Sequence, residues 1–247
     1  MSISFAQRVF RARHAVVLFH TWTVTKEVLA QAIREERSMD LDVCIDDRVN
    51  PYLGHSREYH EKTHELFFNS MPLWEAVEML APSKIPVIVD CKHFEAWPVV
   101  EEVLERLGPE RCLAHGFVSE LKFDAGRMPG EADFLSEWCS IEQLRDLKRR
   151  FPSITTTASA KWLAADTLIV EEYEPLLDGM VKLLKDYAVD TVCLNVPNET
   201  FSDAALRRFL QHGILPHVGV DGIDPRRLSE IYIGETDRLE SATREFR

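Results

Sequence analysis

Positive charge, paired cysteines and long apolar segments are all scarce in this sequence. Lys and Arg number 29 against 41 Asp and Glu, which gives a formal net charge of −12. Such a surplus of negative charge repels phosphate backbones and anionic membranes, so it argues against general nucleic-acid binding. The apolar run at residues 15–19 is too short for a signal peptide, and no stretch of about 18 apolar residues occurs. We therefore expect a cytoplasmic protein without stable membrane insertion.

The sequence also lacks the motifs of several common site classes. Its five cysteines include no CxxC pair, and four of them stand in strand-like apolar runs, which indicates buried thiols outside any disulfide. No glycine-rich phosphate loop follows the first apolar run, where residues 20–23 read His-Thr-Trp-Thr, so a Rossmann nucleotide site is not expected. We find no linker, repeat or low-complexity segment. One domain spanning residues 1–247 is predicted.

What the sequence does contain is a regular alternation of short apolar runs and amphipathic segments. Apolar residues recur at spacings of three and four in the amphipathic segments, which predicts helices at residues 25–37, 71–80, 96–108, 140–151, 173–188 and 202–213. The apolar runs predict eight strands, at residues 15–20, 41–45, 85–91, 111–117, 153–159, 190–196, 214–220 and 230–234. Apolar strands separated by helices indicate parallel pairing with both faces covered. The pattern predicts an α/β fold, a single (β/α)8 TIM barrel, with a doubly wound open sheet as the alternative.

Charged residues stand on the second and third predicted strands. Asp40 and Asp42 are two residues apart, so both lie on one face of the second strand. Asp90 and Lys92 repeat this arrangement on the third strand. Inward side chains at the carboxyl ends of barrel strands form active sites. A buried ion pair between Asp90 and Lys92 is the structural alternative.

The three carboxylates predict a divalent-cation site. If Asp40, Asp42 and Asp90 were buried together without a cation, they would repel one another and their pKa values would rise. Carboxylate oxygens suit Mg²⁺ or Ca²⁺. His20 follows the first strand and His55 follows a turn after the second, so the two imidazoles can act as a general acid and a general base.

The order and spacing of these residues resemble the glycerophosphodiester phosphodiesterase family. The resemblance is most specific between residues 20 and 92, and the Asp-x-Lys at residues 90–92 is similar to that of the related sphingomyelinase D-like enzymes. It implies a metal-dependent enzyme that cleaves a small-molecule phosphodiester. A barrel that binds a phosphorylated ligand or partner without turnover is the alternative, because Thr21 and Ser56 stand where the family has Arg and Asp. The resemblance assigns catalysis to His20, His55 and Lys92, with Lys92 contacting the phosphate, and metal binding to Asp40, Asp42 and Asp90.

One further motif has the letters of a zinc peptidase. His60-Glu61-x-x-His64 would place two histidines on one face of a helix with a glutamate between them. Its neighbours Lys62 and Thr63 are polar, and no third ligand is identifiable. We interpret the segment as a solvated loop or helix face. His115, Asn195 and His217, near later strand ends, are predicted either to contact substrate or to be polar core residues.

Overall fold

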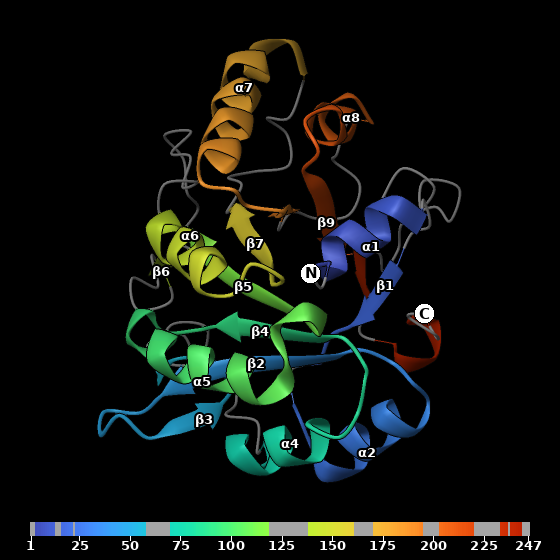
Figure 1. Cartoon of the computed structure of the whole chain (residues 1–247), viewed down its shortest axis with the longest axis vertical. Helices are drawn as coiled ribbons and strands as arrows, with labels where there is room; N and C mark the ends of the chain where they lie inside the picture. The colour runs from blue at the N-terminus through green and yellow to red at the C-terminus, as the bar shows by residue number, and fades with distance from the viewer. Residues whose placement is uncertain are drawn as a thin grey trace.

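The computed structural model describes most of the chain, and Figure 1 shows its arrangement. The described residues are 3–12, 16–21, 23–57, 70–118, 138–160, 170–194, 203–219, 233–236 and 238–243. The strands are β1 (Val16–Phe19), β2 (Met39–Ile45), β3 (Pro51–Leu53), β4 (Val87–Cys91), β5 (Cys112–Val118), β6 (Trp138–Cys139), β7 (Thr155–Ala160), β8 (Thr191–Leu194), β9 (Leu215–Gly219) and β10 (Ile233–Thr236). The helices are α1 (Phe5–Ala12), α2 (Lys26–Arg34), α4 (Leu73–Leu80), α5 (Trp97–Leu107), α6 (Ile141–Arg150), α7 (Val170–Asp186) and α8 (Asp203–Gln211), with 3₁₀ turns η1 (Phe94–Ala96), η2 (Pro109–Arg111) and η7 (Leu239–Ser241).

The strands form one curled sheet in the order β1-β10-β9-β8-β7-β5-β4-β2-β3, with β6 paired to β5. All eight predicted strands and all six predicted helices are present. The neighbouring pairs are parallel except β2 with β3, which form an antiparallel hairpin. This is a TIM-barrel-like α/β fold. The prediction of a closed eightfold barrel is met only in part, because no backbone pair joins β1 to β2 within the described ranges.

Side-chain contacts take the place of backbone pairing at the β1–β2 edge. The backbone N–H of Phe19 donates a hydrogen bond of 2.6 Å to Oγ of Ser38, which is buried just before β2. One residue further along, Nε2 of His20 lies 3.5 Å from Oδ2 of Asp40. The two strands are therefore held together by polar side chains at the end where functional residues are predicted.

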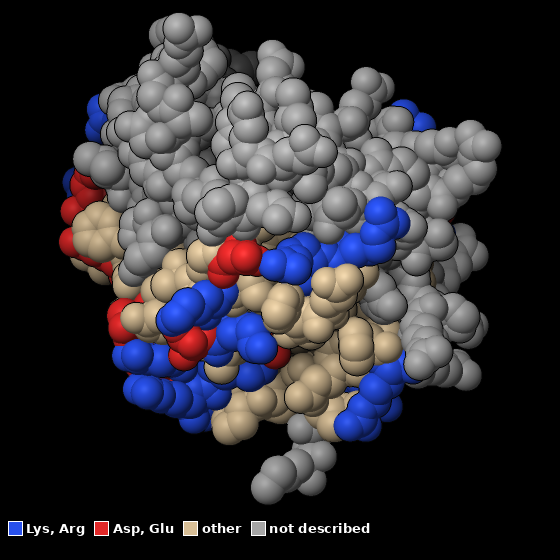
Figure 2. Space-filling model, turned by 90° about the horizontal axis from the view of Figure 1, so that it is seen from above, with Lys and Arg blue, Asp and Glu red and all other residues tan. Residues whose placement is uncertain are grey.

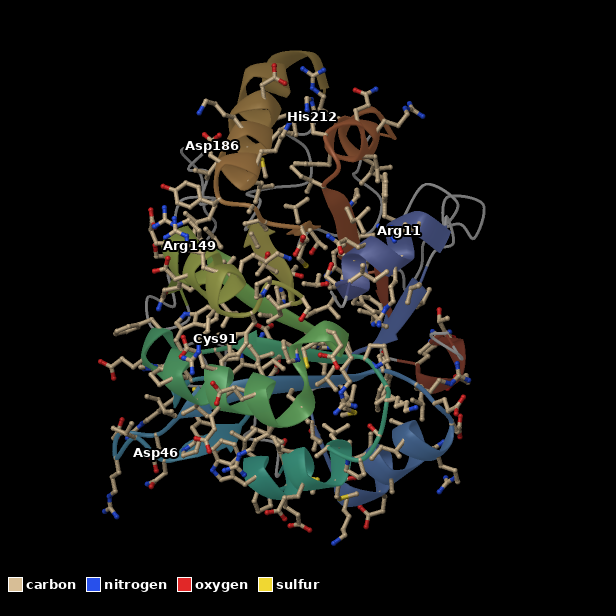
Figure 3. The ribbon with its side chains drawn as sticks, viewed as in Figure 1. Arg11, Asp46, Cys91, Arg149, Asp186 and His212 are labelled. Carbon is tan, nitrogen blue, oxygen red and sulfur yellow. The ribbon has the colours of Figure 1, made fainter. Side chains whose placement is uncertain are left out.

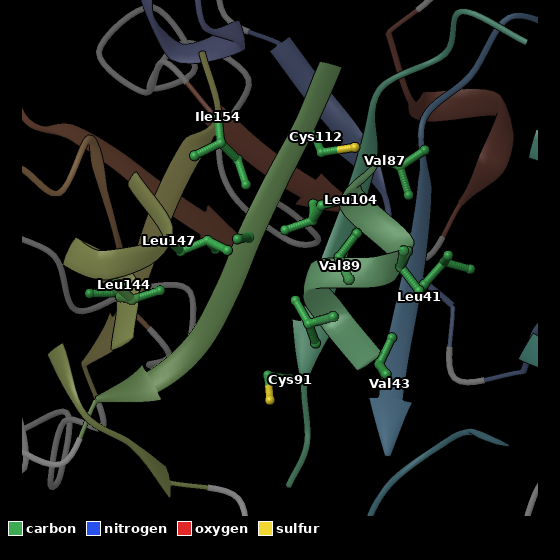
Figure 4. Close-up of a cluster of buried hydrophobic side chains, with 14 of the residues drawn as sticks. Leu41, Val43, Val87, Val89, Cys91, Leu104, Cys112, Leu144, Leu147 and Ile154 are labelled. Carbon is green, nitrogen blue, oxygen red and sulfur yellow. The ribbon is translucent and has the colours of Figure 1, made fainter. Parts of the chain in front are cut away.

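The main hydrophobic core lies between the sheet and the helices outside it. Alternate residues of the strands point outward, as Leu41 and Val43 of β2 and Val89 of β4 do toward α5 (Figure 4). Because successive strand residues face opposite sides, this outward packing turns Asp40 and Asp42 to the inner side of the sheet.

A second, smaller core fills the amino-terminal end of the sheet's interior. It packs Phe5, Ala6 and Val9 of α1 against inward residues of five strands: Leu18, Ile88, Leu113, Leu215 and Ile233. The N–H of Ala6 also donates to Oγ1 of Thr155 at 2.9 Å. Helix α1, which lies beside β1 and β9 in Figure 1, therefore seals this end, and the sequence patterns do not predict it.

The described surface mixes charges of both signs. Figure 2 shows Lys and Arg side chains lying beside Asp and Glu on one face. No helix in the described part of the chain is long and apolar enough to span a bilayer.

Candidate functional site

The interior of the sheet changes from apolar to polar toward the carboxyl ends of the strands. Ile88 and Leu113, which contact α1, are each followed two residues later by an ionisable side chain, Asp90 and His115. The strand register places one row of inward residues side by side: Asp42, Asp90, His115, Thr157, Thr191 and Leu215. The ionisable members of this row, Asp42, Asp90 and His115, lie toward the end where barrel enzymes place their active sites.

Three side chains at the β1–β2 edge are placed to share one cation. His20, Asp40 and Asp42 each offer a ligand atom, and these atoms lie within 4.8 Å of one another. Asp40 and Asp42 are buried, whereas the His20 side chain is 22% exposed. The cluster is therefore anchored in the sheet and reachable from solvent through His20.

A hairpin delivers His55 to the same carboxylates. Gly54 has a φ of +141°, a conformation that favours glycine, and its N–H donates to the carbonyl of Asp42 at 2.8 Å. The Tyr52 hydroxyl donates to the carbonyl of His55 at 2.8 Å, which fixes the backbone after the turn. As a result Nε2 of His55 lies 3.4 Å from Oδ2 of Asp42.

Lys92 is shared by two buried carboxylates. Its Nζ lies 2.7 Å from Oδ2 of Asp90 and 3.5 Å from Oδ1 of Asp42. Burial alone would raise the pKa of Asp42, but the charge of Lys92 and the neighbouring imidazole of His55 outweigh it and lower that pKa below its usual range. In the same way His115 and Lys92 overcome the burial of Asp90 and lower its pKa.

His115 completes a buried chain of charges. Its Nδ1 lies 2.9 Å from Oδ2 of Asp90. Burial lowers the pKa of His115, but Asp90, together with a hydrogen bond to Cys193, raises it well above the ordinary histidine value. The imidazole is therefore protonated at neutral pH in the folded protein.

This protonation predicts a pH-dependent contribution of His115 to stability. The folded-state pKa lies above the unfolded value of about 6.5, so the contribution is complete below that pH and is lost as the pH rises through the folded pKa. We expect His115→Gln to cost more unfolding free energy at about pH 6 than at about pH 9, with a change of at most about 1.4 kcal/mol per pH unit. Urea unfolding of both proteins across this range measures the difference. A cost that grows with pH would contradict the assignment.

The six predicted site residues all lie at this polar end and are linked by the contacts above. His20, Asp40 and Asp42 form the cluster suited to a cation, whereas Asp90 is engaged by Lys92 and His115. The ligand and catalytic roles assigned to these residues stay predictions. His60, His64 and Asn195 lie outside the described residues.

The sequence patterns do not single out His115 and Cys193 as residues of the site. They leave His115 open between a substrate contact and a polar core residue, and they indicate only a buried thiol at Cys193. His115 lies two residues after the inward Leu113, the same spacing that identifies Asp42 and Lys92. Nothing local in the sequence pairs it with Asp90, because that contact depends on the alignment of β4 with β5.

Comparison with known proteins supports the fold without naming a family. No family model and no curated protein matches the chain. Solved structures do match. N-(5'-phosphoribosyl)anthranilate isomerase from Pyrococcus furiosus has a TM-score of 0.52 and 14% identity, over 90% of this chain and 88% of its own. The YdjI aldolase from Escherichia coli K12 has a TM-score of 0.52 and 12% identity, over 95% and 81%. An oxaloacetate acetylhydrolase has a TM-score of 0.53 and 13% identity, over 97% and 82%.

These matches correct the predicted function. They are enzymes of other families, so the prediction of a phosphodiester-cleaving enzyme is wrong, and so is its alternative of a related barrel that binds a phosphorylated ligand. Within the protein, the Asp90 carboxylate is paired with Lys92 and His115. What the comparisons and the sheet topology do establish is that the chain has a TIM-barrel-like α/β fold shared with these enzymes.

Proposed function

We propose that the protein is a divalent-cation-dependent enzyme that acts on a small, negatively charged substrate bearing a carbonyl or carboxylate group. The observation that carries this proposal is the cluster of His20, Asp40 and Asp42, whose ligand atoms lie within 4.8 Å of one another at the carboxyl end of the sheet. Mixed imidazole and carboxylate donors suit Mn²⁺ or Mg²⁺.

The donor set fits such an ion. Asp42 is buried, yet its contacts to His55 and Lys92 are 3.4 Å and 3.5 Å long, beyond ordinary hydrogen-bond lengths. Lone pairs on both of its oxygens therefore point to a further positive partner. His20 and Asp40 come from the two strands that no described backbone pair joins, so a shared ion would also tie β1 to β2. A closed eightfold barrel is part of this proposal.

The charges of the site favour an anionic substrate. Asp40, Asp42 and Asp90 carry three negative charges, against the two positive charges of Lys92 and protonated His115. These five groups sum to one excess negative charge, and a divalent cation would convert this to one excess positive charge.

The chain's own residues then have distinct tasks. A bound cation would polarise a substrate oxygen. Lys92, held between two carboxylates, offers a fixed positive charge for a substrate oxyanion. His55 faces Asp42 through Nε2, so Nδ1 is the ring nitrogen that could exchange a proton with a substrate.

Manganese binding tests the cation site directly. We expect the purified protein to bind one equivalent of Mn²⁺, measured as loss of the free-ion electron paramagnetic resonance signal, and to unfold at a higher temperature when Mn²⁺ is present. Asp40→Asn should weaken binding by about tenfold to a hundredfold and remove the thermal shift. Asp47→Asn, which removes an exposed carboxylate on the β2–β3 hairpin, is the matched control and should bind as the wild type does. Equal Mn²⁺ affinity in Asp40→Asn and the wild type would refute the site.

Turnover is tested separately. Pyruvate and oxaloacetate are incubated with the Mn²⁺-loaded protein in deuterated water. Proton nuclear magnetic resonance then measures deuterium exchange into each compound and the consumption of each compound. Activity that is lost in both Asp40→Asn and Lys92→Met supports the proposal. Activity that survives in the presence of a chelator argues against the cation's role.

A further inference from the structure

The interior of the sheet also holds a thiol, an imidazole and a carboxylate on three of its strands. Cys193 lies on β8, His115 on β5 and Asp90 on β4. These are the residue types that nucleophilic catalysis combines as nucleophile, base and orienting group. We propose that Cys193 is a nucleophile that reacts as a thiolate beside the imidazolium of His115, with Asp90 as the residue that positions His115. This goes beyond the proposed function and does not depend on a bound cation.

Strand register turns Cys193 toward His115. Cys193 is aligned with Ser159 of β7 on one side and with His217 of β9 on the other. Aligned residues of parallel strands point to the same face of a sheet. His217 faces the interior, because its ring lies 6.0 Å from the ring of His115 between centroids. Cys193 therefore points into the same space.

The imidazole of His115 is oriented toward the sulfur of Cys193. Its Nδ1 meets Oδ2 of Asp90 at 2.9 Å, so Nε2 is the ring nitrogen that can exchange a proton with Cys193. A side-chain hydrogen bond joins His115 to Cys193. A protonated imidazole beside a thiol stabilises the thiolate, which is the reactive form.

Ser159 supplies an independent sign that a ligand belongs here. Its side chain is only 1% exposed, and no hydrogen-bond partner of its Oγ is found in the described part of the chain. Buried hydroxyls nearly always have a partner. Because Ser159 is aligned with Cys193, its Oγ is placed to donate a hydrogen bond to an oxygen of a molecule bound at the thiol.

The electrophile that fits this arrangement is the carbonyl carbon of a small acyl ester. Sγ of the Cys193 thiolate, paired with the imidazolium of His115, forms a bond to the carbonyl carbon while the bond to the leaving oxygen breaks. His115 gives its Nε2 proton to that oxygen, and the acyl group is left as a thioester on Cys193. Ser159 donates to the carbonyl oxygen as its negative charge develops.

The other cysteines provide an internal comparison. Cys193 is 7% exposed, whereas Cys44, Cys91, Cys112 and Cys139 are 0%, 1%, 0% and 3% exposed. Burial raises the pKa of the Cys91 thiol and raises that of Cys112 to about 12, so both stay protonated and inert. Figure 3 places Cys91 among the side chains of the molecule's interior.

Alkylation by iodoacetamide tests the proposal in the folded, full-length protein. The reaction is run with a chelator present, so a failure of the cation site does not affect it, and peptide mass spectrometry reads out each cysteine. We expect Cys193 to be alkylated at least about tenfold faster than Cys91 and Cys112. Equal rates at these three cysteines would overturn the proposal without the need for any variant.

Variants and an acyl probe separate nucleophilic activation from mere access. His115→Gln should slow the alkylation of Cys193 by at least about tenfold. The matched control is His212→Gln, at an exposed position after α8 that Figure 3 labels, and it should leave the rate unchanged.

The acyl probe p-nitrophenyl acetate should acetylate Cys193 ahead of every other residue. Ser159→Ala should slow this acetylation while leaving the alkylation of Cys193 unchanged. Acetylation spread over surface lysines, or alkylation unaffected by His115→Gln, would refute the assigned roles.

Discussion

Replacing Lys92 with methionine will destabilise the protein by about 3–5 kcal/mol, because it leaves two buried carboxylates without their shared cation. The methionine side chain fills most of the volume of the lysine side chain. The loss of stability therefore reports the removed charge and not lost packing. Chemical denaturation at neutral pH measures the change. Lys84→Met, at an exposed position before β4, is the matched control and should change stability by less than about 0.5 kcal/mol.

The same substitution has a pH signature. Lys92 and His115 keep the pKa of Asp90 depressed in the folded protein, so the stability that Asp90 contributes is present above about pH 4 and is lost as the pH falls. Without Lys92 the carboxylates become easier to protonate, and the penalty of Lys92→Met should shrink in acid. The double substitution Lys92→Met with Asp90→Asn should be less destabilised than the sum of the two single substitutions. A penalty below about 1 kcal/mol at neutral pH would show that solvent reaches these carboxylates.

Replacing Arg111 with methionine will cost a comparable amount, about 3–5 kcal/mol. The buried guanidinium donates to the carbonyls of Leu107 and Ser83, each at 2.7 Å, of Leu80 at 3.0 Å and of Ile85 at 3.2 Å. These carbonyls belong to the ends of α4 and α5 and to the connection into β4, so one side chain holds three segments together. Removal would leave buried acceptors unsatisfied.

The stabilising contacts of Arg111 depend on the directions of the guanidinium donors and not on its charge alone. Arg111→Lys should recover little stability, because an ammonium group cannot direct donors to four carbonyls at once. Arg149→Met, on α6, is the matched control, since the Arg149 side chain is 68% exposed and its pairing with Asp146 is a surface contact. Unfolding of the three variants in urea gives the comparison. A Lys variant as stable as the wild type would show that charge alone suffices.

The strands and helices are predictable because their signal is local. Outward residues such as Leu41 and Val43 alternate with inward ones, so the spacing of Asp40 and Asp42 is enough to place both carboxylates on the inner face. The same logic places Asp90 and Lys92 together. It does not detect α1, whose apolar residues have no partner until five strands present their inner faces to it.

The partners of the charged side chains depend on contacts between strands. Local spacing is sufficient to bring three carboxylates, two histidines and a lysine to the carboxyl end of the sheet. Alignment of β4 with β5 then pairs Asp90 with His115 as well as with Lys92, and the β1–β2 edge brings His20 to Asp40. Strand spacing fixes which face a residue takes, but a contact between strands depends on register and on how the sheet curls, which no local pattern encodes. For that reason the location of the site can be read from the chain, whereas the fold selects which of its charges are paired and which can still bind a cation.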